Sequence, residues 1–487
     1  MVPLGVSATI SGARPNRFIA LLARHQVPGA QLAVYRGDEL ATIAAGTLED
    51  STLEDSTRTA VTEDAAFPLG SITKAFTATL AMVLVADGDL ELQAPVREYL
   101  PELGDDPAGQ LTLTHLLSHT SGLPCDPPAE ADQTIGLSRY TATYCRQENM
   151  ICEPGSAFSY SNVGYVVVGR MIEAVTGMGW REAMESILLG PLGIDPAFVC
   201  FDQPTNRPIA TGHAGNPASG RLRPVEQTLD PAAAPTGALA ASALDLVTLG
   251  RLHLDDGRPD LLPASFSALM RRPVPYADPF GVADGWGLGL ATYQGSMVGH
   301  DGNAQGTACY LRVDPSQDLV VALTSNATTG YQLWQDVLGL LAQDGIEAGP
   351  AAVDLPRRIE QPPLVTPALG DRDSTVRHDD HQAELDHLPA ASVGRYANGA
   401  VSYVVSADHD DQLRLTVDEE VSAQLTVGPE LAFSLIDPES NTAVSGGRFV
   451  PGETTGEIDA IQVGGRLAVR IGRPASQNSQ KPARTSA

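Results

Sequence analysis

The stretch FPLGSITKAFTATLAMVLVA, residues 67–86, joins a short polar motif to a long apolar run. The apolar residues predict a largely buried helix over 72–86 that ends near Gly88. Ser71 and Lys74 stand three residues apart at the start of this helix, so they share one face. A serine hydroxyl needs a nearby base to act as a nucleophile, and a neutral lysine can be that base. This S-x-x-K pattern therefore predicts a covalent catalytic centre, with a serine cap and an unrelated lysine as the alternative.

Lysine is almost absent from this chain. Of its 31 basic residues only Lys74 and Lys481 are lysines, and Lys481 stands in a polar C-terminal stretch. Arginine keeps its proton near neutral pH, whereas the environment of a lysine can make it lose its proton. The use of lysine at position 74 therefore favours the catalytic interpretation.

The overall composition limits the possible partners. The 487 residues include 31 basic and 59 acidic side chains, a net charge of −28. This balance argues against binding to nucleic acid or to an anionic membrane surface, and no apolar run approaches the roughly 18–20 residues of a membrane span. The N-terminus lacks the basic and apolar segments of a secretion signal, and the five cysteines show no CxxC spacing. We therefore expect a cytoplasmic protein with free thiols.

Strand and helix patterns alternate over residues 1–349. A helix is expected over 16–24, strands over 30–35 and 39–45, a helix over 164–176, strands over 307–312 and 318–324, and a helix over 331–342. The fold class is therefore α+β, with an antiparallel sheet flanked by helices. The tandem repeat LEDSTLEDST, residues 48–57, indicates a lengthened surface loop.

The composition changes near Gly349. Residues 350–390 are rich in Pro, Asp, Arg and His and show no sustained period, which is typical of a linker. Short alternating segments follow at 401–406, 412–417, 423–427, 431–436, 458–463 and 466–471. Their close spacing predicts a small antiparallel barrel or sandwich over 391–473, followed by a disordered tail over 474–487.

Two further patterns suggest a site. In Tyr160-Ser161-Asn162 the phenol can pass on a proton, and the amide can bind a substrate peptide group. In His300-Asp301-Gly302 the glycine lets a substrate backbone approach a strand edge, and the histidine can orient an acyl group. Taken singly, a buried tyrosine and a hairpin turn are the simpler interpretations.

The three patterns, in this order and at this spacing, resemble the penicillin-recognising serine hydrolases, in which S-x-x-K, Y-x-N and H-x-G meet in one cleft. The segments LTLTHLLSHTSGLP, residues 111–124, and GWGLGL, residues 285–290, resemble the class C β-lactamase-like branch. The resemblance covers about residues 15–345. It implies a β-lactamase/penicillin-binding-protein-like domain, in which a helical subdomain accompanies the antiparallel sheet.

A narrower resemblance is to the penicillin-binding-protein-type thioesterases, stand-alone enzymes that release nonribosomal peptides from carrier proteins by head-to-tail cyclisation. It rests on AFSYSNVGYVVVGRMIEAVTGM (157–178), PLGIDPAF (191–198) and GHDG (299–302), with a small C-terminal β-domain. The resemblance implies a lipocalin-like barrel and an arginine that faces the active site, for which Arg466 is the matching residue. An ordinary solvated strand arginine is the alternative at this position.

The resemblance implies acyl transfer without a cofactor or a metal. Neutral Lys74 would take the proton of Ser71, which attacks the thioester of a carrier-bound or pantetheine-linked peptide ending in a D-residue. The backbone N–H groups of Ser71 and Asn303 would hold the oxyanion, and Tyr160 would relay the proton. The amine of the peptide would then close a macrolactam. Substrate contacts are expected from Asn162, His300, Gly302, Asn303 and Arg466.

Other interpretations stay open. A hydrolase of the same fold (a D-aminopeptidase, an esterase or a β-lactamase) would form the same acyl-enzyme and pass it to water. A non-catalytic ligand-binding or sensor protein is a third class, against which the intact Ser71, Lys74 and Tyr160 weigh. His115 and His119 are spaced like a metal-binding pair, but the glutamate of H-E-x-x-H and a third ligand are missing.

Overall fold

The computed structural model describes residues 14–49, 59–128, 135–201, 205–216, 221–254, 257–349, 391–408, 412–419, 421–436, 443–452 and 458–471. By their contacts these residues form two units. The first holds the described residues up to 349 together with the turn Gly464–Arg466, and the second holds the rest of the C-terminal part. The predicted linker, the predicted tail and most of the repeated LEDST segment lie outside the described residues.

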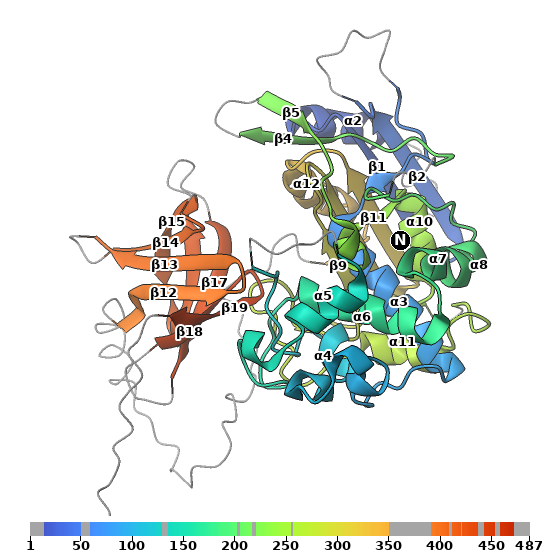
Figure 1. Ribbon diagram of the computed structural model, residues 1–487. Coiled ribbons are helices and arrows are strands. Elements are labelled where there is room, and N and C mark those ends of the chain that lie inside the picture. The colour runs from blue at the N-terminus through green and yellow to red at the C-terminus, as the bar shows by residue number, and fades with distance from the viewer. Residues whose placement is uncertain are drawn as a thin grey trace, which may run out of the picture. The chain divides into compact units, whose positions relative to one another are not determined.

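A seven-stranded antiparallel sheet is the centre of the first unit (Figure 1), with the strand order β2-β1-β11-β10-β9-β8-β7. The strands are β1 (Gly29–Arg36), β2 (Glu39–Gly46), β7 (Gly285–Trp286), β8 (Ala291–Thr292), β9 (Val298–Gly302), β10 (Ala308–Asp314) and β11 (Leu319–Ser325). The N-terminal strand β1 pairs with β11, so that Ala33 lies opposite Ala322. The sheet therefore joins residues from both ends of the unit, and the predicted hairpin and the predicted β10–β11 pair are confirmed.

Both faces of the sheet are buried. Successive side chains of a strand point to opposite faces, and in β1 they enter two different cores. Leu32 of β1 belongs to the core under α2 (Arg14–Arg24) and α12 (Gly330–Ala342). Its neighbour Ala33 belongs to the larger core on the side of α10 (Ala243–Arg251). The sheet is therefore a middle layer between two groups of helices.

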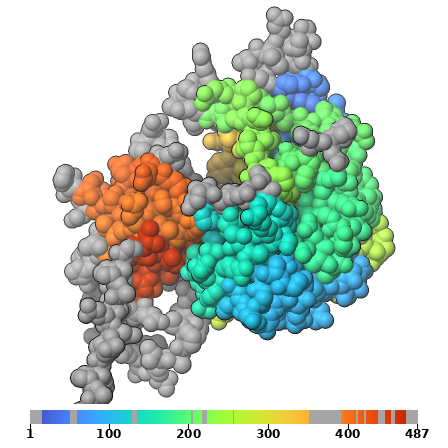
Figure 2. Space-filling model, viewed as in Figure 1, coloured from blue at the N-terminus to red at the C-terminus, as the bar shows by residue number. Residues whose placement is uncertain are grey.

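The helical part of the first unit lies between β2 and β7 in sequence, and Figure 2 shows its surface as one continuous face. Its helices are α3 (Thr73–Asp87), α4 (Leu113–Leu117), α5 (Leu137–Tyr144), α6 (Asn162–Thr176), α7 (Trp180–Ala183), α8 (Gly190–Leu192), α9 (Ala234–Gly237), α10 and α11 (Ala264–Arg271). Glycines with positive φ end α3 and α6, at Gly88 (+84°) and Gly177 (+69°). The predicted helix ends near Gly88 and at residue 176 are confirmed.

The helix α3 lies in the middle of this part and packs against α6 and α9. The expectation that no apolar run approaches the length of a membrane span is wrong for the described residues: Gly70–Asp87 is long and apolar enough, although 78% of it is buried inside the protein, as in a core helix.

Short elements complete the first unit. Two small sheets are formed by β3 (Phe67–Pro68) with β6 (Ala240–Ala241) and by β4 (Gly212–Asn216) with β5 (Arg221–Val225). The single-turn segments are η2 (Gly70–Ile72), η3 (Val96–Glu98), η4 (Pro101–Leu103), η5 (Pro107–Gln110), η6 (Gln147–Asn149), η7 (Met184–Leu189, a π-helix), η8 (Pro231–Ala233) and η9 (Pro315–Gln317). The pairing of β3 with β6 connects the segment before η2 to the segment after α9.

The second unit is a closed antiparallel barrel. Its strands are β12 (Gly394–Asn398), β13 (Val401–Ala407), β14 (Leu413–Val417), β15 (Val421–Val427), β16 (Ala432–Ile436), β17 (Ala443–Pro451), β18 (Ile458–Val463) and β19 (Arg466–Ile471), with the 3₁₀ turn η10 (Pro429–Leu431) before β16. The pair Tyr396–Arg470 between β12 and β19 closes it. Buried residues such as Tyr396, Leu415 and Phe449 form its core. The predicted fold class is confirmed, although β12 and β17 are absent from the six predicted strands.

Candidate active site

Ser71 and Lys74 meet at the start of the core helix α3. Ser71 lies in the 3₁₀ turn η2 and is half-buried, and Lys74 is the second residue of α3. Lys74 Nζ lies 3.2 Å from Ser71 Oγ and donates a hydrogen bond of 2.9 Å to the carbonyl oxygen of Thr236 in α9. The amine is therefore held between a hydroxyl and a carbonyl from a distant part of the chain.

Lys74 is only 1% exposed. Burial lowers its pKa from 10.5 to about 7, because the charged amine loses its hydration, while the nearby Cys125 and Asp126 oppose the shift. A neutral amine with a free lone pair is therefore accessible near neutral pH. Such an amine can accept the proton of Ser71.

Tyr160 lies in the segment just before α6, and its ring centroid is 5.0 Å from Lys74 Nζ. Burial raises the pKa of its hydroxyl, and the adjacent Ser71 offsets part of this rise. The hydroxyl makes no hydrogen bond within the described part of the chain, although Ser71 lies near enough to act on its pKa. Because the phenol stays protonated at neutral pH, it can donate and relay a proton, while Lys74 is the group that can act as the base.

Asn162 is the first residue of α6, whose N-terminus is capped by Ser161 Oγ. Its Nδ2 donates to Asp126 Oδ1 at 2.6 Å. Asp126 also acts on Lys74, whose pKa it raises. The side-chain amide of Asn162, which is predicted to bind the substrate, is therefore fixed by the carboxylate of Asp126 near the Lys74 amine. Sequence reasoning missed Asp126, since no motif marks it.

His300 and Gly302 lie in β9, so the hairpin-turn interpretation of this pattern is wrong. His300 Nδ1 lies 2.7 Å from the carbonyl oxygen of Asp301. A carbonyl only accepts hydrogen bonds, so Nδ1 carries the ring proton and Nε2 presents a lone pair. Burial, followed by the nearby Lys74, lowers the pKa of His300 to about 4. His300 is therefore a neutral acceptor at neutral pH.

The end of β9 packs directly on the turn that carries Ser71. A Cβ at Gly302 would lie 2.0 Å from the carbonyl oxygen of Leu69, and one at Gly70 would lie 2.2 Å from that of Asn303. Only glycine allows these approaches, and Gly70 also has a φ of +52°. The Asn303 backbone is therefore brought beside η2, where a helix start leaves N–H groups without an intrahelical partner.

Aromatic rings surround Tyr160. The ring of Trp286 lies with its centroid 5.2 Å from His119, 5.5 Å from Phe158 and 5.3 Å from His300. Trp286 belongs to the segment GWGLGL, which sequence reasoning used for the resemblance without assigning the tryptophan a role, whereas His119 was expected to be a structural histidine beside the cleft. His119 and Trp286 lie 4.3 and 6.0 Å from the Tyr160 ring, so these buried rings form an aromatic wall beside it.

His115 and His119 have separate roles, unlike a metal-binding pair. His115 Nδ1 accepts from the backbone N–H of Thr112 in a capping box at the start of α4, whereas His119 lies among the aromatic rings. Within the part of the chain that the structure describes, no three His, Cys, Asp or Glu side chains gather as a metal site. The described residues include all five cysteines, and none of them forms a disulfide.

Arg466 is the first residue of β19 and belongs to the turn Gly464–Arg466, which groups with the first unit. Its contact with a bound peptide stays a prediction.

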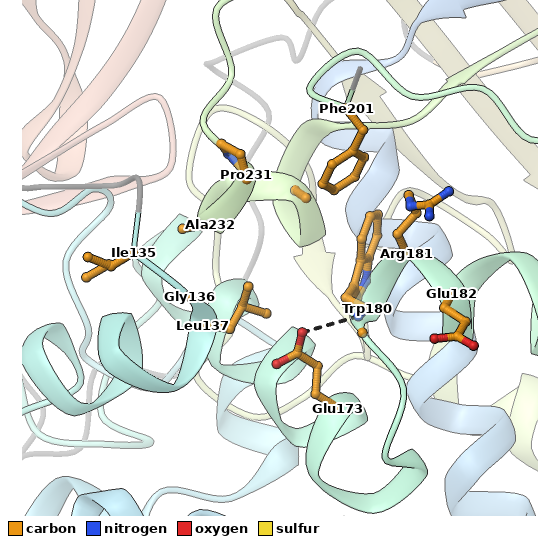
Figure 3. A pocket seen from close by; sticks show the side chains of 12 residues that line it. Ile135, Gly136, Leu137, Glu173, Trp180, Arg181, Glu182, Phe201, Pro231 and Ala232 are labelled. Atoms are coloured by element: carbon orange, nitrogen blue, oxygen red, sulfur yellow. Dashed lines mark hydrogen bonds between the residues drawn. The ribbon is translucent and has the colours of Figure 1, made fainter. Parts of the chain in front are cut away.

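A separate cavity of about 350 Å³ lies near the C-terminal end of α6 (Figure 3). Its lining includes Leu137, Glu173, Trp180, Phe201 and Ala232, and none of the predicted site residues. It is therefore a hollow distinct from the Ser71 centre.

Comparison with known proteins identifies relatives of this chain. The family model described as Beta-lactamase matches residues 16–343. Penicillin-binding protein 4 of Amycolatopsis lactamdurans is 36% identical over 369 residues, which cover 72% of this chain and 95% of that protein. The crystal structure of SurE superposes with a TM-score of 0.76 at 36% identity, and the match covers 96% of this chain and 100% of that chain. The crystal structure of SurE with D-Leu superposes with a TM-score of 0.74 at 36% identity, and the match covers 95% of this chain and 100% of that chain. A D-stereospecific amidohydrolase from Streptomyces sp. is 26% identical with a TM-score of 0.52, and 66% of this chain and 94% of that chain are covered.

Proposed function

This chain belongs to the beta-lactamase family of serine hydrolases, and from that premise we propose that it is a peptidyl thioesterase and cyclase. Ser71 forms an ester with the peptidyl group of a carrier-bound or pantetheine-linked thioester whose acyl residue has the D configuration. The N-terminal amine of the same peptide then displaces Ser71, and the product is a head-to-tail macrolactam.

The observation that carries the acyl-transfer step is the buried Lys74 amine, 3.2 Å from Ser71 Oγ, with its pKa lowered to about 7. In the first step Lys74 takes the Ser71 proton while Ser71 Oγ attacks the thioester carbonyl. The carbon–sulfur bond then breaks. The leaving thiolate takes the hydroxyl proton of Tyr160, and Tyr160 regains a proton from the Lys74 ammonium. At the end of this step Lys74 is neutral, Tyr160 is protonated and the thiol has left.

Two neighbouring parts of the site support the remaining roles. The backbone N–H groups of Ser71 and Asn303 are proposed to bind the oxyanion, because Gly70 and Gly302 let β9 approach the Ser71 turn. His300 is proposed to align the acyl chain through its Nε2 acceptor, and Asn162 through the amide that Asp126 orients. In the second step Lys74, now neutral again, removes a proton from the attacking amine and returns it to Ser71 Oγ as the ester C–O bond breaks.

The cyclase assignment rests on the resemblance of the motifs and on the relatives. The chain is similar to SurE over both units, and one SurE structure was determined with D-Leu, which supports a D-configured acyl residue. Cyclisation requires that a bound amine competes with water, and a high effective concentration at a desolvated ester gives it that advantage. The aromatic wall around Tyr160 supports this exclusion of water.

A hydrolase is the second candidate. The similarity to a D-stereospecific amidohydrolase favours it, because that name indicates hydrolysis. The same name also indicates action on D-configured groups. The acyl-enzyme would be the same, and water would replace the amine in the second step. The product therefore separates the two candidates.

The test is to offer a peptidyl-pantetheine thioester with a C-terminal D-residue and a free N-terminal amine, and to weigh the product by mass spectrometry. The proposal expects a product lighter than the linear acid by one water. The same peptide with an acetylated amine is the matched control, because it can give only the acid. If several free-amine peptides yield linear acids as the main product, the hydrolase is correct and the cyclase is not.

A further inference from the structure

His119 is buried completely and has no part in the steps above. It follows the short helix α4 and has a φ of +58°, a left-handed conformation that costs energy for a residue with a side chain. A strained residue of this kind persists only where the surrounding contacts hold it. Those contacts lead to Tyr160.

Two hydrogen bonds connect His119 to the residues on either side of Tyr160. The His119 carbonyl oxygen accepts from the Ser159 N–H at 2.9 Å, and His119 Nδ1 accepts from the Ser161 N–H at 3.0 Å. The imidazole also stacks on the Tyr160 ring, with the centroids 4.3 Å apart and the planes inclined by 31°. One residue therefore holds both the backbone and the ring of Tyr160.

The same contacts define the protonation of His119. Because the Ser161 N–H donates to Nδ1, the ring proton must be on Nε2. Burial, followed by the nearby Lys74 and His300, keeps the pKa of His119 well below its usual range, so the ring is neutral. A neutral ring can stack on the phenol without adding a second positive charge beside the Lys74 ammonium.

We propose that His119 is the positioning residue of the proton relay: it holds the Tyr160 hydroxyl at the distance from Ser71 and Lys74 that proton transfer needs. This inference rests on the proposed function, because it assumes that Tyr160 protonates the leaving group. His119 acts through Tyr160 and touches neither the substrate nor the reacting atoms in this role.

The test is a double-mutant cycle between His119 and Tyr160. His119→Asn removes the ring, keeps an oxygen that can accept from the Ser161 N–H, and suits a positive φ better than most residues. We expect the single-turnover release of pantetheine from the thioester to slow about 100-fold, with KM changed less than about threefold, because a small misplacement of a reacting group has an effect of this size. In a Tyr160→Phe background, His119→Asn should slow the single-turnover release of pantetheine by less than about threefold.

A second variant and a control separate positioning from a general loss of structure. His119→Phe keeps a ring in the same volume but leaves the Ser161 N–H unpaired, so we expect about a tenfold loss that again disappears in Tyr160→Phe. If His119→Asn fails to fold, the rates of His119→Phe with and without the Tyr160 hydroxyl test the positioning role instead. The matched control is His253→Asn, since His253 is equally buried, hydrogen-bonded to Ser267 and outside the site; its effect should be the same in both Tyr160 backgrounds.

The outcomes distinguish this inference from the proposed function. Equal losses from His119→Asn with and without the Tyr160 hydroxyl would overturn the positioning role, as would an unchanged rate in the single variant. A wild-type protein that releases no pantetheine, or a Tyr160→Phe variant as fast as the wild type, would instead overturn the relay in the proposed function. Released pantetheine is counted by mass spectrometry, so the result does not depend on whether the product is cyclic or linear.

Discussion

Replacing Lys74 with methionine should change how the stability of the first unit depends on pH. In the folded protein burial lowers the pKa of Lys74 from 10.5 to about 7. Between these two values the unfolded chain binds a proton at this position and the folded chain does not. The free energy of unfolding of the wild type therefore rises with pH across this window, because the unfolded state binds more protons.

The size of the effect follows from the two pKa values. The neutral amine costs the folded state about 4 kcal/mol at pH 7 and about 2 kcal/mol at pH 9, since each pH unit in this range corresponds to about 1.4 kcal/mol. Methionine removes this cost at every pH. It also removes the hydrogen bond to Thr236, but that loss does not depend on pH. The stability of Lys74→Met relative to the wild type should therefore fall by about 2 kcal/mol between pH 7 and pH 9.

The assay is denaturant unfolding followed by tryptophan fluorescence at both pH values. All three tryptophans, Trp180, Trp286 and Trp334, lie in the first unit, so the signal reports that unit. Lys481→Met, which removes the other lysine of the chain, is the matched control and should show no such difference. A stability difference between Lys74→Met and the wild type that stays flat from pH 7 to pH 9 would refute the lowered pKa and, with it, the assignment of Lys74 as the base.

The remaining predictions concern the contacts around this amine. Ser71→Ala should lower thioester cleavage at least about a thousandfold with the free energy of unfolding changed by less than about 1 kcal/mol, as measured by product formation and denaturant unfolding. Gly302→Ala should destabilise the protein by about 1–3 kcal/mol and slow acylation, because its Cβ has no room. The control is Gly339→Ala, at an exposed helical position with open space, which should be neutral or slightly stabilising. Equal effects of the two substitutions on stability would contradict the close packing of β9. Asn162→Asp should lower the free energy of unfolding by about 1–3 kcal/mol at pH 8. The loss follows from placing a second carboxylate against Asp126 in place of the amide that donates to it; a variant as stable as the wild type would exclude the contact.

Some elements of the first unit, such as α3, α6 and the β1–β2 hairpin, could be predicted from local pattern because they carry local signals. Both long core helices end at glycines with positive φ, and the β1–β2 hairpin alternates over a tight turn. Elements without such signals were missed. Strands β7 and β8 have two residues each, too few for any period to be visible.

The barrel shows a second limit of local pattern. Strand β17 contains Gly446 and Gly447 and ends at Pro451, and these residue types usually indicate turns. Its place in the barrel depends on its neighbours β16 and β18. The closing pair of β12 with β19 joins segments about 70 residues apart, which only the tertiary fold brings together.

In the candidate site, too, some residues could be predicted from the sequence and others could not. Residues that act through a distinctive side chain, such as Ser71 and Lys74, can be found from residue type and spacing. Thr236 holds the Lys74 amine through its backbone carbonyl, a group that every residue has. Nothing in the residue type could therefore indicate Thr236. Asp126 and His119 act through partners that are distant in sequence, and a single chain carries no signal for such pairs.

The ring of strands in the second unit has a consequence for how this unit can be recognised. Since β12 bonds to β19, the described strands leave no free backbone row along which a foreign strand could be added. A partner protein or a peptide would have to bind through side chains on the outer wall or through the connecting loops. Mutations meant to alter such recognition can therefore be directed at surface side chains.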